Sequence, residues 1–281
     1  MKRIIIALVI LSAACINLTA VFNDYEPSPR ARALSGAFYS TSDDAFAVFY
    51  NPAGLIRSGK NIAMSYTHRY GSDFSILSSV AVSWDLPKKF GTVGLGLMAH
   101  DVDYLDVNLM SEKTYALSHA IILMKDIHSE IAFGYSLNLY HLSISGFGEQ
   151  PSFGLNLGAI VVLHQRTRIG FAVNNINNPK LGEDNRHDLP QKMSIGIAYE
   201  PYQNITTIFE LRKSVDDDTE IHTGAEVTVF DILALRFGVR NNPASYSAGA
   251  GFQIYDIIVD YGFNTHSTLS GTHHIGLGYK F

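Results

Sequence analysis

The sequence predicts an all-β fold, a transmembrane antiparallel β-barrel of about fourteen strands. From residue 61 to the C-terminus, short segments alternate apolar and polar residues, which is typical of strands between hydrocarbon and a polar lumen. Hydrophobic residues make up 47% of the chain and charged residues 17%, yet no run beyond residue 20 approaches the roughly twenty apolar residues that a membrane helix needs. Because a bilayer leaves no water for a free strand edge, these strands are expected to close into a barrel.

The first twenty residues are typical of a secretory signal peptide. A short basic start precedes an apolar core at residues 4–14, and small or polar residues follow up to Ala20. That core is too short to span a membrane as a helix. We therefore expect an exported protein whose mature chain begins near Val21. Lipoprotein cleavage at Cys15, the sole cysteine, is the alternative, and signal removal beyond Cys15 would leave no thiol.

Residues 21–58 show no sustained period of two and are rich in small and turn-forming residues. Pro52 fixes its own backbone, Gly54 permits a tight bend, and Asn51 and Asp43 carry side chains that cap backbone groups. These features predict a compact plug before the first strand. A periplasmic cap or a flexible leader is the alternative.

Two stretches of this segment form the most specific motif in the chain. Residues 30–38 read Arg-Ala-Arg-Ala-Leu-Ser-Gly-Ala-Phe, and residues 43–55 read Asp-Asp-Ala-Phe-Ala-Val-Phe-Tyr-Asn-Pro-Ala-Gly-Leu. The motif resembles the N-terminal signature of the PorV/PorQ group of outer-membrane proteins, and residues 50–55 are similar to the wider FadL/TodX superfamily of hydrophobic-compound transporters. The resemblance implies a FadL-like barrel with an N-terminal hatch inside its lumen. It assigns hatch and gating roles to Asp43, Asp44, Asn51, Pro52, Ala53, Gly54 and Leu55.

The chain departs from the transporter pattern in two ways. Its 281 residues are fewer than in typical members of that superfamily, and its longest predicted loops are polar rather than apolar. No long apolar loop is present to serve as a first docking groove for a lipid. These departures leave room for a scaffold or secretion role.

The expected division of the chain is a signal peptide at residues 1–20, a hatch at 21–58 and a transmembrane barrel at 59–281. The ascending strands of the barrel are predicted near residues 61–69, 91–100, 130–141, 168–174, 205–212, 233–240 and 257–264. The descending strands are predicted near residues 76–85, 114–123, 153–163, 191–200, 220–229, 245–253 and 272–281.

The connections between these strands alternate between two kinds. Tight connections are predicted at residues 86–90, 124–129, 163–167, 201–204, 230–232 and 254–256. Mostly longer and more polar connections are predicted at residues 101–113, 142–152, 175–190, 213–219 and 265–271. Short periplasmic turns and longer outer loops are expected of outer-membrane barrels, so both ends of the chain are placed on the periplasmic side.

The two faces of the strands separate by chemistry. In residues 233–240, Leu235 and Phe237 alternate with Arg236, so the charges fall on the lumen phase. The predicted polar lining of the lumen is Glu210, Arg212, Glu226, Arg236, Arg240 and Asp260. The hatch charges Arg30, Arg32, Asp43 and Asp44 are expected to pair with lumen charges such as Glu210, Arg236 and Asp260.

Many glycines share the lumen phase. The examples are Gly94, Gly96, Gly134, Gly158, Gly196, Gly249 and Gly251. They either leave room for something inside the barrel or relieve crowding where strands coil, and the sequence leaves both interpretations open.

Aromatic residues on the outward phase predict contact with outer-membrane lipid. They are expected to form the interfacial girdles of the barrel. The residues are Tyr66, Trp84, Tyr115, Tyr135, Tyr199, Phe209, Phe252, Tyr261 and Tyr279.

Catalytic and metal chemistry is not predicted. His266, His273 and His274 lie close together in the sequence. His273 and His274 are consecutive, so a strand would point them to opposite faces, and no carboxylate or thiol beside them completes a coordination set. Aspartates at residues 101–106 and 216–218 are suited to calcium, although such runs are more often solvated loop charge. No serine–histidine pair lies in an oxyanion-hole motif, and no phosphate-binding loop is present, so we expect no enzyme and no cofactor. The net charge of −5 argues against a nucleic-acid partner.

Two functions follow. The leading hypothesis is a porin-like, passive transporter of small hydrophobic molecules, integral to the outer membrane of a Gram-negative-type bacterium and gated by the hatch. The alternative is a PorV/PorQ-like partner of a type IX-like protein secretion system, with no transport of its own. Both rest on the same motif and the same predicted barrel.

Overall fold

The computed structural model describes residues 22, 25–87, 90–105, 107–146, 148–182, 187–215 and 217–281. The predicted signal peptide, with the alternative cleavage at Cys15, lies outside the described residues. Within the described part of the chain, no helix is both long enough and apolar enough to cross a membrane.

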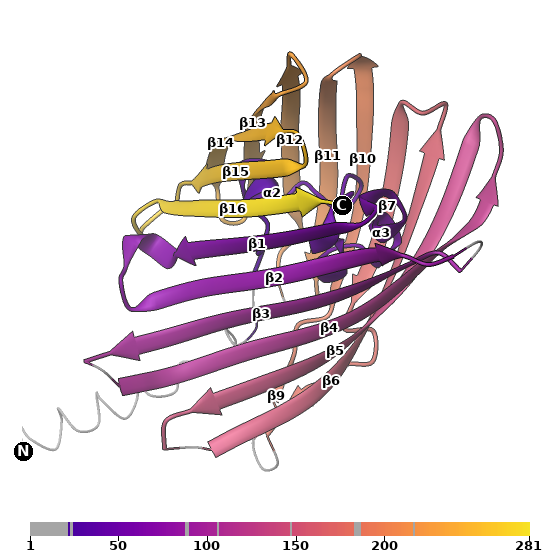
Figure 1. The fold of residues 1–281 in the computed structure, drawn as a ribbon. Coiled ribbons are helices and arrows are strands. Elements are labelled where there is room, and N and C mark those ends of the chain that lie inside the picture. Colours follow the sequence, from indigo (N-terminus) through magenta and orange to yellow (C-terminus); the bar gives the residue numbers. More distant parts are fainter. Residues whose placement is uncertain are drawn as a thin grey trace, which may run out of the picture.

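The described residues form fourteen antiparallel strands that close into one barrel, as the sequence predicts (Figure 1). Each strand pairs with its neighbours along the chain, and β1 closes the ring by pairing with β16. The strands are β1 Asn61–His68, β2 Ser75–Asp85, β3 Thr92–Tyr104, β4 Val107–Lys125, β5 Ser129–Ile144, β6 Gly148–Leu163, β7 Thr167–Asn174, β10 Lys192–Tyr202, β11 Ile205–Ser214, β12 Glu220–Val229, β13 Leu233–Arg240, β14 Ser245–Ile254, β15 Ile257–Asn264 and β16 Thr272–Lys280. The tight connections and the last residue lie at one end, the turn end; the opposite end is the loop end.

Two of the predicted loops are wrong. Residues 101–113 and 142–152 are mostly strand, because β3 and β4, and likewise β5 and β6, continue as paired hairpins toward the loop end. Both segments are richer in polar and charged residues than the strands before them, which is what a loop would also show. Backbone pairing, however, needs no apolar face once a hairpin has left the bilayer.

The loop at 175–190 contains a small hairpin of its own, formed by β8 Lys180–Leu181 and β9 His187–Asp188. Beside it, β7 ends at Asn174 and leaves part of β6 without a neighbouring strand. The side chain of Asn177 covers that edge: its Oδ1 accepts from the Leu155 amide at 2.8 Å, and its Nδ2 donates to the Phe153 carbonyl at 2.7 Å. An amide side chain thereby satisfies backbone groups that an unpaired edge would leave free.

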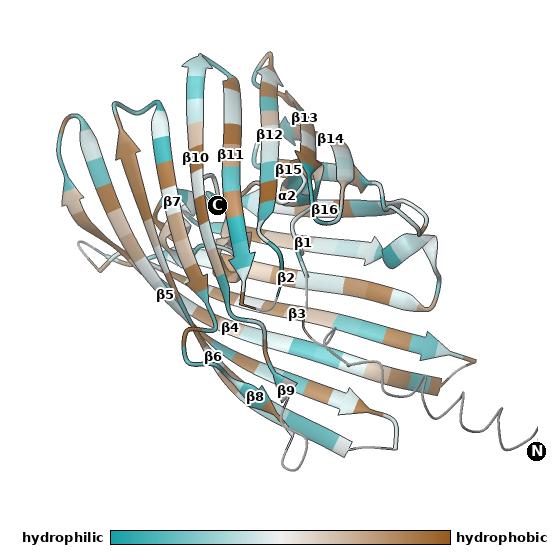
Figure 2. Ribbon diagram, turned by 180° about the vertical axis from the view of Figure 1, so that it is seen from behind, coloured by the Kyte–Doolittle hydropathy of each residue, from teal (hydrophilic) through white to brown (hydrophobic). Residues whose placement is uncertain are grey.

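The two faces of the wall follow the predicted alternation. Along β13, Leu235 and Phe237 are exposed while Arg236 and Arg240 are buried on the lumen side. Figure 2 shows the same alternation as bands of opposite hydropathy along the strands. All nine outward aromatic residues named above are exposed, at 40–49% of their surface. The register of the strands therefore agrees with the prediction.

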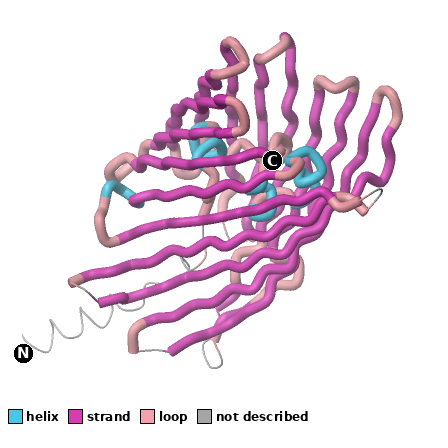
Figure 3. Tube along the Cα trace, viewed as in Figure 1, coloured by secondary structure: helices cyan, strands magenta, loops and turns pink. Residues whose placement is uncertain are grey.

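The described segment directly before β1, residues 25–58, lies inside the ring of strands (Figure 3). It contains four short helical elements: α2 Pro29–Ala33, η1 Ala45–Phe49, η2 Pro52–Gly54 and α3 Leu55–Ser58. A further short turn, η3 Arg69–Gly71, belongs to the connection between β1 and β2. Helix α2 contacts β13 to β16, whereas η1, η2 and α3 contact β1 to β6. We call residues 25–58 the hatch.

Candidate functional site

The hatch touches the wall where the strands carry glycine. A Cβ atom on Gly134 would lie 2.5 Å from the Ala53 amide nitrogen, and one on Gly158 would lie 2.0 Å from Asn51 Oδ1. On Gly94 and Gly96, a Cβ would lie 2.5 Å from side-chain atoms of the hatch. Of the two interpretations of these glycines, the structure supports the first: they make room for a segment inside the barrel. Gly251 instead makes room for the lumen charges of Arg236 and Asp260.

Asn51 is fully buried and links the hatch to the wall. Its Nδ2 donates to the carbonyl of Tyr39 at 2.9 Å and to the wall carbonyls of Ala159 at 3.2 Å and Phe171 at 3.4 Å. Its Oδ1 accepts from the amide of Ala53 at 3.2 Å and so caps η2. One side chain thus satisfies backbone groups of two hatch segments and two strands.

The neighbouring residues of the motif are buried as well. Pro52 begins η2, where its missing N–H costs no hydrogen bond. Gly54 passes so close to Ser42 that a Cβ would lie 1.7 Å from the Ser42 carbonyl oxygen. Ala53 and Leu55 are at most 1% exposed. The structure therefore brings together residues 51–55 as one tightly packed turn.

The side of the hatch that faces β1 to β4 is apolar. Its core contains Phe38, Val48 and Tyr50, with the rings of Phe38 and Tyr50 packed edge to face at 5.1 Å. The wall contributes small side chains to the same cluster, namely Ala63, Ala81, Ala116 and Ala120. Small wall residues let the hatch approach the strands closely.

On its turn-end side the hatch is joined to the wall by ion pairs. Arg30 pairs with Asp43 at 2.5 Å and with Glu226 of β12 at 2.9 Å, and Asp43 also pairs with Arg168 of β7 at 2.9 Å. Arg236 extends the network, pairing with Glu226 at 2.6 Å and with Asp260 at 2.5 Å. Arg30 and Asp43 pair with lumen charges, as predicted. Their wall partners are Glu226 and Arg168 rather than the expected Glu210, Arg236 and Asp260.

This network shifts the pKa values of the two hatch aspartates in opposite directions. Burial alone would raise the pKa of Asp43, but the charges of Arg30 and Arg168 hold it well below its usual range. Burial raises the pKa of Asp44 to about 7, helped by the negative charges of Asp43 and Asp260 and opposed by Arg30. The Asp44 side chain accepts from the Phe46 amide at 2.9 Å and caps η1. Asp44 thus sits between a helical turn and other carboxylates.

A second charged network joins the hatch to β11. Arg212 is 4% exposed and donates to Glu26 of the hatch at 2.7 Å, to the Gly36 carbonyl at 3.0 Å and to Glu210 at 3.3 Å. Glu210, fully buried, accepts from the backbone amide of Tyr39 at 2.9 Å. These contacts attach the hatch to β11 through both side chains and backbone.

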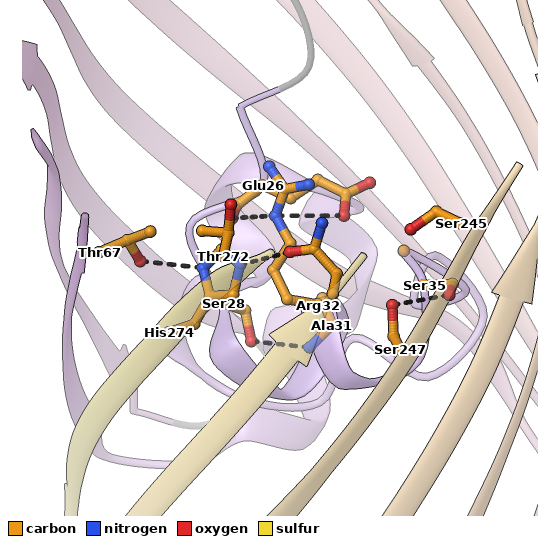
Figure 4. A network of polar contacts seen from close by, with 12 residues as sticks. Glu26, Ser28, Ala31, Arg32, Ser35, Thr67, Ser245, Ser247, Thr272 and His274 are labelled. Carbon is orange, nitrogen blue, oxygen red and sulfur yellow. Dashed lines mark hydrogen bonds and ion pairs between the residues drawn. The ribbon is translucent and has the colours of Figure 1, made fainter. Parts of the chain in front are cut away.

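Polar contacts continue around α2 (Figure 4). Arg32 lies against Glu26, with its Nε 3.1 Å from the Glu26 carbonyl oxygen. Ser28 caps α2, and Ser35 donates to Ser247 of the wall at 2.8 Å. On the wall beside α2, His274 has Thr67 on one ring nitrogen at 2.9 Å and Asn264 on the other at 2.7 Å.

The predicted lining residues all face the lumen, but they do not form a single cluster. Glu226, Arg236 and Asp260 belong to the turn-end network, whereas Glu210 and Arg212 belong to the network on β11. Arg240 is buried on the lumen side of β13. Sequence reasoning missed Glu26 and Arg168. Arg168 lies at a strand start with no charge pattern around it, and Glu26 lies before the recognised motif, so neither carried a signal.

Two cavities lie on opposite sides of the hatch. The loop-end cavity has a volume of about 90 Å3 and borders Tyr39 and Phe49 of the hatch. The turn-end cavity has a volume of about 320 Å3 and borders Arg30, Asp43 and Asp44 of the hatch. Both are otherwise lined mainly by lumen-facing residues of the strands. The hatch is what divides the lumen at this level.

The loop-end cavity carries polar groups at its rim and in its wall. The Tyr25 hydroxyl donates to the buried carboxylate of Glu112. The same hydroxyl lies 2.9 Å from Nδ1 of His100. Tyr140 donates to Asn175 at 2.7 Å and packs edge to face against Phe22 at 5.1 Å. Within the described part of the chain, Thr114 Oγ1 and Asn174 Oδ1 are buried without a hydrogen-bond partner.

A third hollow lies on the outside of the barrel. It has a volume of about 470 Å3 and is lined mainly by outward apolar residues of β2 to β6, among them Leu97, Tyr115 and Leu137. It belongs to the surface that the alternation assigns to lipid.

The histidines near the last loop do not converge. His273 points outward, where Tyr261 lies 2.7 Å from its Nδ1, whereas His274 is buried. Among the described residues, no group of three or more metal-binding side chains comes together.

Comparison with known proteins gives fold likeness only. No protein-family model matches the chain, and no curated protein matches it. Among solved structures, the chain is similar to the CymD monoaromatic hydrocarbon channel, with a TM-score of 0.63 and 13% identity over 93% of this chain and 99% of that one.

Two further solved structures are similar to the same extent. A Pseudomonas aeruginosa FadL homologue matches with a TM-score of 0.60 and 12% identity, over 91% of this chain and 98% of that one. The Pseudomonas putida toluene transporter TodX matches with a TM-score of 0.61 and 11% identity, over 90% and 98% of the two chains. At such identities the likeness shows a shared fold: a closed barrel of the kind seen in FadL and TodX.

Proposed function

We propose that this protein is a passive channel of the outer membrane that admits small hydrophobic molecules, with residues 25–58 as its gate. One observation carries the proposal: a single closed barrel contains two cavities separated by a packed hatch. The structural neighbours are described as a monoaromatic hydrocarbon channel and a toluene transporter, which agrees with this function.

The architecture suits gated passage. The described hydrogen bonds between hatch and wall have a side chain on at least one side, so the hatch is able to shift without breaking the strand ladder. Its apolar side packs on small wall residues, whereas its ion pairs hold the opposite side in place. Movement of the apolar side would join the two cavities. A gradient of the ligand suffices to drive such transport, so no energy source or cofactor is implied.

Uptake by cells tests the proposal. A host that lacks related channels would express the protein, and uptake of radiolabelled toluene would be measured. We expect Thr114→Phe, which fills the loop-end cavity, to lower uptake. The matched variant Thr207→Phe puts the same ring on the exposed outer face of β11 and should leave uptake unchanged. Uptake equal to that of cells without the protein would contradict the proposal.

A secretion-partner role, as in the PorV/PorQ group, is the second candidate. What favours it is the small size of the loop-end cavity, about 90 Å3, together with the apolar hollow of about 470 Å3 on the outer wall. A scaffold needs no open lumen, and an outward apolar hollow is suited to contact with another membrane protein. Co-purification from native membranes in mild detergent tests this role. A stable complex with a secretion channel is the expected result, and isolation of the barrel alone would count against it.

A further inference from the structure

The loop-end cavity is more polar than a passage for hydrocarbons needs. Beside aromatic side chains and Met98, its lining contains Thr114 and Lys192. It also contains four asparagines, Asn138, Asn156, Asn174 and Asn175. Several of these amides are engaged: Asn138 donates to Tyr140, and Asn156 accepts from the backbone of Asn175 at 2.8 Å. They form a fixed polar wall.

Two polar groups of this lining have no partner within the described residues. Thr114 on β4 is 4% exposed and its hydroxyl makes no hydrogen bond. The amide oxygen of Asn174 at the end of β7 is likewise buried and unpaired. A buried polar group without a partner costs about 1–3 kcal/mol, so such groups are uncommon unless something else satisfies them. Two of them around one cavity point to a ligand with hydrogen-bonding groups.

The rest of the cavity is suited to a ring. Phe22, Phe49 and Tyr140 contribute aromatic surfaces to the lining, and Met98 adds a flexible apolar side chain. The volume of about 90 Å3 is below the ~150 Å3 of a cavity that accepts benzene, so a bound ring must widen it. The combination of ring surfaces and unpaired polar groups defines an amphipathic site.

We propose that this cavity selects small uncharged aromatic molecules that bear a hydroxyl group over hydrocarbons of the same size. This inference rests on the proposed channel function and names its substrate class. A hydroxyl both donates and accepts, so it serves the Asn174 oxygen as a donor and the Thr114 hydroxyl in either direction. A methyl group in its place would leave these groups unpaired. An ionised ligand would lose its hydration in a buried site, which disfavours it.

Ligand binding to the full chain in lipid nanodiscs tests this. The probes are 4-fluorophenol and 4-fluorotoluene, followed by 19F NMR, with nanodiscs that lack protein as the blank for partition into lipid. We expect the phenol to bind about tenfold more tightly, the ratio that corresponds to one net hydrogen bond. Thr114→Val and Asn174→Leu should each reduce that ratio. Thr228→Val, the same change in the turn-end cavity, should not.

The outcomes separate this inference from the channel function. Equal binding of both probes, or a ratio unmoved by both variants, would overturn the inference while toluene uptake by cells could still stand. Tighter binding of 4-fluorobenzoate would also overturn it, because that would assign the selectivity to Lys192. Absence of uptake in cells would refute the channel, whatever the nanodiscs show. The heat-dependent shift of the barrel on gels would establish that each variant is folded, and Thr114→Val keeps the shape of the side chain if Asn174→Leu fails to assemble.

Discussion

At the scale of single residues, Asn51 is one of the side chains that join the hatch to the wall. Its amide donates to carbonyls of the hatch and of two strands, and it is fully buried. A side chain in this position supports the hatch by hydrogen bonding rather than by charge. Its role as a gating residue stays a prediction from the resemblance.

We expect Asn51→Ala to lower the free energy of unfolding by about 1–3 kcal/mol, because it leaves buried carbonyl groups without a donor. Urea unfolding in lipid vesicles measures this. Asn108→Ala is the control, since the exposed Asn108 side chain donates to the exposed Asp103 and its loss should change stability by less than about 0.5 kcal/mol. Equal losses of unfolding free energy in the two variants would show that the hydrogen bonds of Asn51 do not stabilise the hatch.

Asp44 gives the hatch a dependence on pH. Its pKa of about 7 in the folded state exceeds the ordinary 3.8, so the folded state binds more protons between these values. The contribution of Asp44 is therefore full below about pH 4 and is lost as the pH rises to about 7. Asp44→Asn keeps the cap on η1 and removes the titration. The difference in unfolding free energy between variant and parent should change between pH 4.5 and 7, and parallel curves would contradict this.

At the scale of elements, the wall strands are shaped to receive the hatch. Gly134→Ala would bring a methyl group to 2.5 Å from the backbone of Ala53 and Pro52, so the hatch must shift. We expect the variant to show raised ion conductance in planar bilayers. Gly278→Ala is the matched control on the same face, where the nearest atom is 3.5 Å away. Similar conductance in both variants would argue that the hatch does not close the lumen.

The outward face of β13 tests the membrane register. Leu235 is exposed near the middle of this strand, so Leu235→Arg should cost about 2–4 kcal/mol if it meets the bilayer midplane. Val239→Arg, closer to the loop end, should cost only about 0–1 kcal/mol. Unfolding in vesicles measures both. Equal costs would place the strand at a different depth.

At the scale of the whole molecule, the hatch and the barrel are expected to resist proteolysis together. Arg32 is 7% exposed, and Arg30 is engaged by Asp43 and Glu226. Trypsin should therefore cut after these residues only once the barrel is heated, as followed by mass spectrometry. Rapid cleavage in the folded protein would indicate a flexible leader instead.

The strands themselves were predictable from sequence because lipid imposes a local rule. Residues that face lipid are mostly apolar, so the period of two repeats from β1 to β16 whatever the neighbouring strand is. The bounds of β12, β13 and β15 agree with prediction to the residue. The rule stops at the bilayer surface, which is why the sequence predicts loops where β3 to β6 continue as strands.

The amino-acid sequence by itself thus determined the barrel, the outward face of each strand and the segment that lies before them. Only the tertiary structure decided what that segment touches. The pairs Asp43–Arg168 and Glu26–Arg212 join residues more than a hundred positions apart, and Thr114 and Asn174 meet one cavity from separate strands. Such contacts depend on how the ring closes around the hatch, and closure leaves no trace in the local alternation that a sequence displays.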